Sequence, residues 1–125
     1  MPDEDGAFRA KVVYLILSKE TEQALCMLSR HYKVVEPRIK LGMPKRHSRN
    51  AACYVAKTKM IHVSHREILF NPPVILHEFY HHLRSVSDAQ GGIEKYANKF
   101  AAKYMKTYQS TVTRNILGTR ENEEK

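Results

Sequence analysis

The stretch Asn-Pro-Pro-Val-Ile-Leu-His-Glu-Phe-Tyr-His-His-Leu-Arg, residues 71–84, decides how this chain folds. Asn71 can cap a helix by accepting a backbone hydrogen bond, and Pro72 suits the first helical position because it has no amide hydrogen. Histidines aside, Glu78 is the only acidic or basic residue between Pro72 and Leu83. A helix exposed to water carries more charge than this, so the stretch predicts a largely buried helix.

Within this helix lies the pentapeptide His-Glu-Phe-Tyr-His, residues 77–81. Side chains four positions apart lie on one face of a helix, so His77 and His81 can bind one metal ion together. Glu78 then lies beside the metal, where it can take a proton from a metal-bound water. The pattern predicts a metal-binding helix that carries its own general base, as in zinc peptidases.

A catalytic zinc ion usually has three protein ligands. Beyond the glycine pair at 91–92, apolar residues recur at helical spacing and predict a second helix over about 93–108. Glu94, in its first turn, is our candidate third ligand, although a carboxylate is also favoured there by the helix dipole alone. Asp88 is the alternative, in a polar segment with no helix to aim it. Asn98, one turn after Glu94, could hydrogen-bond the second ring nitrogen of a ligand histidine.

The pattern His77-Glu78-x-x-His81 followed by Glu94 resembles the gluzincin metallopeptidases over about residues 50–106. It is most similar to the very small members, the minigluzincins and the ImmA/IrrE-type metallopeptidase domain. The resemblance implies a minimal zincin-like domain with zinc bound by the two histidines and Glu94, and with Glu78 as general base and acid. It also implies a protein or peptide substrate held extended along a sheet edge.

The resemblance does not extend to the C-terminal subdomain from which larger gluzincins supply a group that stabilises the transition state. Four residues are candidates for that role here: His62, His65, Tyr104 and Tyr108. The simpler interpretation is that the histidines lie on the surface and that the tyrosines pack between helices.

A small antiparallel sheet is expected ahead of the metal-binding helix. Residues 51–56 and 60–64 predict a hairpin around Lys57-Thr58-Lys59, and residues 34–41 predict a further strand. Since Met60-Ile61-His62-Val63-Ser64 directly precedes the metal-binding helix, it is the predicted substrate edge.

The remaining segments complete an α+β domain. Residues 20–32 predict a helix, and residues 11–17 predict either a strand or, as we favour, the front of a helix. Residues 1–8 are expected to form a flexible arm and residues 114–125 a mobile tail. The tail could also fold across the cleft and make an enzyme latent. We expect one minimal metallopeptidase domain over 1–125.

Composition leaves a second function open. The formal charge is +8 with a pI of about 9.6, and the densest basic stretch, residues 45–49, is either a solvated loop or a contact for phosphates or acidic protein. The protein is therefore a zinc-dependent endopeptidase or a non-catalytic zinc-binding module that contacts an acidic partner or nucleic acid through its basic surface. Glu78 distinguishes the two, because a structural metal site needs no general base.

Cysteine usage and hydropathy indicate the compartment. Cys26 and Cys53 form no Cys-x-x-Cys pair, which favours free thiols, with a disulfide left open. The apolar run at 12–17 is too short to span a membrane and follows an acidic start unlike a secretory signal. We expect a cytoplasmic protein with no membrane partner.

Overall fold

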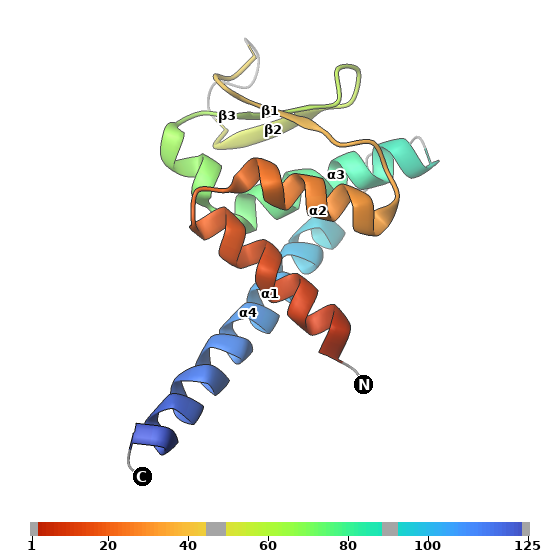
Figure 1. Ribbon diagram of the computed structural model, residues 1–125. Helices are drawn as coiled ribbons and strands as arrows, with labels where there is room; N and C mark the ends of the chain where they lie inside the picture. The colour runs from red at the N-terminus through yellow and green to blue at the C-terminus, as the bar shows by residue number, and fades with distance from the viewer. Residues whose placement is uncertain (1–2, 45–49, 89–92, 124–125) are drawn as a thin grey trace.

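A computed structural model describes residues 3–44, 50–88 and 93–123, and Figure 1 shows a small sheet lying against a layer of helices. The predicted α+β class is confirmed. The elements in chain order are α1 (Asp3–Leu17), α2 (Thr21–Tyr32), β1 (Arg38–Leu41), β2 (Ala52–Val55), β3 (Met60–Val63), the 3₁₀ helix η2 (Arg66–Phe70), α3 (Pro72–Asp88) and α4 (Glu94–Glu123).

The sheet has the strand order β1-β3-β2 and is mixed. β2 and β3 form the predicted antiparallel hairpin, with Cys53 opposite His62. β1 pairs in parallel with β3, with Ile39 opposite Ile61, so the prediction of a wholly antiparallel sheet is wrong. Because β2 lies between β1 and β3 in the chain, this pairing is non-local and leaves no hairpin signal.

The strand order also corrects the predicted substrate edge. The segment Met60–Ser64 contains β3, the central strand, which has a hydrogen-bonded neighbour on both sides. An added peptide needs a free edge, and in this sheet the edges belong to β1 and β2. Since β2 packs against α3, the edge near α3 is β2.

The core lies between the sheet and the four helices. Ile61 and Val63 of β3 are fully buried on the face opposite His62, as strand alternation requires. The helices contribute apolar side chains of very low exposure, namely Val12, Val13, Ile16, Leu25, Leu28, Ile75, Leu76, Phe79 and Tyr104.

The N-terminal segment is helical from residue 3. α1 begins at Asp3, and the flexibility of residues 1–8 stays a prediction. Phe8 of this helix contacts α2, where its ring stacks on His31 with centroids 4.1 Å apart. The favoured helix over 11–17 is confirmed, but it ends at Leu17, before a turn in which Lys19 has a φ of 69°.

The C-terminal segment also differs. α4 runs without interruption to Glu123, so residues 114–123 are helical, and the mobility of the tail stays a prediction. In Figure 1 this end of α4 projects away from the sheet. Within the described chain, this segment therefore does not fold across α3.

Three further expectations concern single features. No helix among the described residues has the length and apolar character needed to cross a membrane. Cys26 and Cys53 are both free thiols, the first half-buried and the second buried. The basic stretch 45–49 lies outside the described residues.

Candidate metal centre

α3 presents the histidine pair in a defined direction. The Val74 amide donates to Asn71 Oδ1 at 3.3 Å, so Asn71 caps the helix as predicted. Leu76 and Phe79 are fully buried on the opposite side. Because the buried face fixes the rotation of the helix, the face that carries the histidine pair points out of the core.

The side chains of His77, His81 and Glu94 converge from two helices. Nε2 of His81 lies 2.6 Å from Oε1 of Glu94, and Nε2 of His77 lies 3.3 and 3.2 Å from the two carboxylate oxygens. One ligand atom from each residue lies within 4.8 Å of the others. The structure thus brings together the three residues that the sequence predicts as ligands. Their binding of a metal stays a prediction.

Asp88, the alternative third ligand, is less well placed. It is the last residue of α3, two turns beyond His81. Seven helical residues correspond to about 10 Å along the axis. Glu94 is therefore the better candidate.

The hydrogen bond between His77 and Asn98 determines which ring nitrogen of His77 faces Glu94. Nδ1 of His77 lies 2.8 Å from Oδ1 of Asn98, the contact that the spacing predicts. Because an amide oxygen can only accept, Nδ1 carries the hydrogen, and Nε2 of a neutral imidazole then presents a lone pair. That lone pair faces the carboxylate of Glu94, another acceptor. A metal ion placed between these two acceptors would satisfy both.

The two separations to Glu94 can be compared with the distances between ligand atoms around a zinc ion. Two ligand atoms at about 2.0–2.1 Å from zinc in tetrahedral geometry lie roughly 3.3 Å apart. The 3.2 Å between His77 and Glu94 matches this value, whereas the 2.6 Å between His81 and Glu94 would have to widen. Glu94 can move, because its side chain is 75% exposed. Two imidazoles and a carboxylate are also a donor set that zinc prefers.

The two carboxyl groups of the site are shifted in opposite directions. Glu78 is buried, which raises the pKa of its carboxyl. Glu94 raises that pKa further, while His77 and His81 lower it without reversing the net effect. For Glu94, burial acts to raise the pKa, but the hydrogen bond with His81 and the nearby His77 outweigh it and lower the pKa. Glu94 therefore stays anionic, as a ligand must, while Glu78 is suited to exchange a proton.

An open groove of about 570 Å³ lies beside these residues. Its walls include Ala52 of β2, Val74 of α3 and the carboxyl-bearing side chains of Glu78 and Glu94. The groove thus joins the predicted general base, the predicted third ligand and the free edge of the sheet. That combination could accommodate an extended chain.

None of the four predicted transition-state donors lines this groove. Tyr104 is buried, and its hydroxyl lies 2.7 Å from that of Tyr32, while Tyr108 packs against the core. His62 hydrogen-bonds the Gly42 carbonyl, and His65 hydrogen-bonds its neighbour Ser64. The simpler interpretation of these residues, as packing and surface groups, therefore fits the structure.

His82 has a structural role that its sequence context does not reveal. Its ring is fully buried, with Nε2 2.7 Å from the Val35 carbonyl and Nδ1 2.7 Å from the Tyr54 hydroxyl. The carbonyl can only accept, so Nε2 carries the hydrogen and Nδ1 accepts from Tyr54. His82 therefore connects α3 to β2 and to the α2–β1 segment in its neutral form.

Comparison of this chain with protein-family models, curated proteins and solved structures gave no match.

Proposed function

We propose that this protein is a zinc-dependent peptidase of the gluzincin type, with zinc held by His77, His81 and Glu94. The observation that carries the proposal is the convergence of these three side chains beside a buried carboxyl group, Glu78, at an open groove that His77, Glu78 and Glu94 line. A purely structural zinc site is closed and has four protein ligands. Here the described residues offer three, and the groove leaves room for a substrate.

Zinc at this position would supply Lewis acidity, which makes water a nucleophile near neutral pH and polarises a carbonyl. Glu78 would accept the proton that water loses and return it to the leaving amine. Asn98 would hold the His77 ring so that Nε2 faces the ligand position.

The free edge of β2 would bind the substrate. The Ser64 amide donates to the Ala51 carbonyl at 2.8 Å, so Ala51 is turned toward β3. In an antiparallel ladder successive residues alternate in direction, which turns the amide and carbonyl of Ala52 and Tyr54 outward. Ala52 also lines the groove. A peptide added along β2 would thus pass the metal position with backbone groups available on its partner strand.

The test combines metal content with turnover. The wild type, Glu78→Gln and Glu94→Ala are assayed for zinc per chain and for cleavage of an internally quenched random peptide library. We expect about one zinc per chain in the wild type and in Glu78→Gln. Cleavage should fall at least ~10²-fold in Glu78→Gln, because glutamine cannot accept the proton. Glu94→Ala should lose both zinc and cleavage.

Other outcomes decide against the proposal. A wild type that binds zinc and cleaves nothing would favour the non-catalytic zinc module. A wild type that binds no zinc would rule out both the zinc peptidase and the non-catalytic zinc module.

The substrate edge has its own test in Ala52→Pro. Proline is tolerated on an edge strand but lacks the outward amide hydrogen, so we expect kcat/KM to fall by about 3–10-fold, the worth of one net hydrogen bond. Zinc content should not change. Ala52→Val keeps the amide and is the matched control. An unchanged kcat/KM in Ala52→Pro would place the substrate elsewhere.

A further inference from the structure

The long helix α4 carries positive charge without neutralisation. Between Lys95 and Arg114 it has five cationic residues and no Asp or Glu. We call four of them the lysine stripe: Lys95, Lys99, Lys103 and Lys106. Neither the gluzincin-type site nor its substrate groove uses any of these side chains.

Helical spacing places the lysine stripe on one face. Steps of four, four and three residues keep the four side chains within a sector of roughly 80°, and Arg114 lies at its border. All five side chains are exposed. From Lys95 to Arg114 the stripe and its extension are about 28 Å long. The apolar side of the same helix, with Ala97, Ala101 and Tyr104, is buried in the core.

These cations have no acidic partner among the described residues. The ion pairs found there join Glu94 to His77 and His81, and none involves the lysine stripe. Lys99 does lie over the ring of Tyr96, 5.6 Å from its centroid, which leaves its charge in place. The stripe therefore presents unneutralised charge to a partner.

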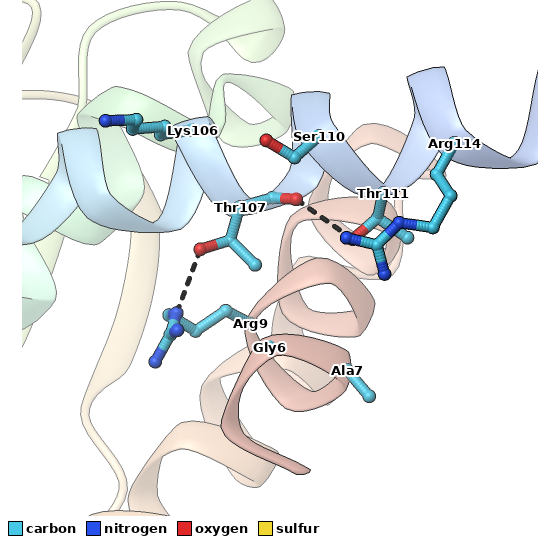
Figure 2. A pocket seen from close by; sticks show the side chains of 8 residues that line it. All are labelled: Gly6, Ala7, Arg9, Lys106, Thr107, Ser110, Thr111 and Arg114. Atoms are coloured by element: carbon cyan, nitrogen blue, oxygen red, sulfur yellow. Dashed lines mark hydrogen bonds between the residues drawn. The ribbon is translucent and has the colours of Figure 1, made fainter. Parts of the chain in front are cut away.

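A pocket of about 390 Å³ extends the stripe where α1 crosses α4, and Figure 2 shows Arg9 reaching from α1 to Thr107. Nε of Arg9 donates to Thr107 Oγ1 at 3.1 Å, which leaves the two terminal nitrogens of the guanidinium available. The lining combines three cationic side chains with three hydroxyl groups and includes no carboxylate: Arg9, Lys106, Arg114, Thr107, Ser110 and Thr111. The hydroxyls of Thr107 and Thr111 donate to backbone carbonyls of α4, so of these three Ser110 can donate to a ligand. Guanidinium, ammonium and hydroxyl groups together are the usual protein contacts of a phosphate.

We propose that the lysine stripe and this pocket bind the phosphodiester backbone of double-stranded nucleic acid without reading its sequence. A duplex presents about one negative charge per 1.7 Å of axis, so it can face a straight row of cations along its whole length. A single strand is less suited, because its binding sites present exposed rings for base stacking. Past Tyr96 the aromatic residues of α4 are buried or half-buried.

Two other polyanions fit less well. A helix that binds an anionic membrane needs an exposed apolar face to insert, whereas the apolar side of α4 is buried in the core. An acidic protein partner would match the charge but not the regular row, since carboxylates on a folded surface are rarely so evenly spaced. Both are outcomes of the test below.

The test measures binding of the full chain to a short labelled DNA duplex of arbitrary sequence across a salt series. If the four lysines, Arg9 and Arg114 each neutralise one phosphate, log K should fall with log salt with a slope of about −5.4. Replacing the four stripe lysines by glutamine should flatten the slope by about 3.6. Glutamine is nearly as good a helix former as lysine, and replacement by arginine should restore the slope.

The matched control carries the same charge change elsewhere. Lys19, Lys33, Lys40 and Lys57 are exposed and lie outside α4, and their replacement by glutamine should leave the slope within about one unit of the wild type. Far-ultraviolet circular dichroism and zinc content verify that both variants fold.

Four results would overturn the proposal. They are no binding of the duplex at low salt, equal loss in the two glutamine variants, tighter binding of the matched single strand, and tighter binding of phosphatidylserine vesicles or polyglutamate than of the duplex. Each can occur whether or not the chain cleaves peptides, so this proposal and the peptidase proposal fail independently.

Discussion

His81 and His82 are neighbours in the chain, yet they have opposite environments. His81 lies on the open face of α3, where its Nε2 contacts the exposed carboxylate of Glu94. His82 is fully buried, and a carbonyl and a hydroxyl occupy its two ring nitrogens. One residue is suited to bind a ligand, and the other holds the fold together.

The difference arises from about 100° of helical rotation between adjacent residues. That rotation turns the ring of His82 toward β2, where it hydrogen-bonds the Tyr54 hydroxyl and the Val35 carbonyl. A histidine count in the sequence therefore says little, because the same side chain serves either purpose according to its helical face.

The contrast between His81 and His82 predicts its largest effect for His81→Leu, in the zinc content of the protein. Removing one of the three proposed ligands should reduce zinc from about one per chain to nearly none. His82→Leu should keep its zinc, because its ring points away from the site. Elemental analysis of both purified proteins after dialysis against zinc checks this. Equal zinc loss in both variants would mean that the site depends on general folding rather than on one helix face.

For the free energy of unfolding we expect the opposite order, with a larger loss in His82→Leu than in His81→Leu. His82→Leu removes the two hydrogen bonds of a fully buried ring, to the Val35 carbonyl and the Tyr54 hydroxyl, which should cost about 2 kcal/mol of unfolding free energy. His81→Leu changes a ring near the surface and should cost less than ~1 kcal/mol in the metal-free protein. Urea denaturation in the presence of a chelator measures both. A larger loss for His81→Leu would contradict the assigned roles.

Local sequence signals predict the parts of this molecule that depend on local interactions. Asn71 caps α3 and the hairpin of β2 with β3 forms around its predicted turn, because each depends on residues close together in the chain. The convergence of His77, His81 and Glu94 was also within reach, since helical spacing fixes the pair and the first turn of α4 supplies the carboxylate.

Non-local contacts account for what the sequence missed. β1 pairs in parallel with β3, which makes β3 the central strand. This pairing depends on where in space the chain leaves α2. Ile93 fits the apolar pattern of the second helix but is 55% exposed, because it precedes the first helical residue. The length of α4 was underestimated, since the segment beyond Tyr108 is mostly polar, although Val112 and Ile116 continue the helical spacing.

Asn98 provides a further test, which concerns the zinc affinity of the proposed site. Asn98→Ala removes the acceptor that holds the His77 ring, so zinc affinity should fall by about 10–100-fold. Asn98→Asp keeps an acceptor at the same place and should retain most of the affinity. A competition titration with a zinc-binding dye measures both. If the alanine variant binds zinc as tightly as the wild type, the hydrogen bond to His77 does not orient the ligand.

The smallest expected effect is a pH dependence that belongs to His82. Burial lowers the pKa of its imidazole below the ordinary value of 6.5, and the charge of Lys59 lowers it further, while the hydrogen bond to Val35 opposes both. Below pH 6.5 the unfolded chain therefore binds a proton that the folded chain excludes, so acid destabilises the fold by up to about 1.4 kcal/mol per pH unit until the folded pKa is reached. His82→Gln cannot titrate and should lack this part of the slope.

The stability gap between wild type and His82→Gln should accordingly be widest above pH 6.5 and narrow as the pH falls. Denaturation of both proteins at matched pH values in a chelator isolates it, because the groups around Glu94 titrate in both and cancel in the difference. If the difference in unfolding free energy between the two proteins stays constant with pH, His82 keeps its ordinary pKa despite its burial.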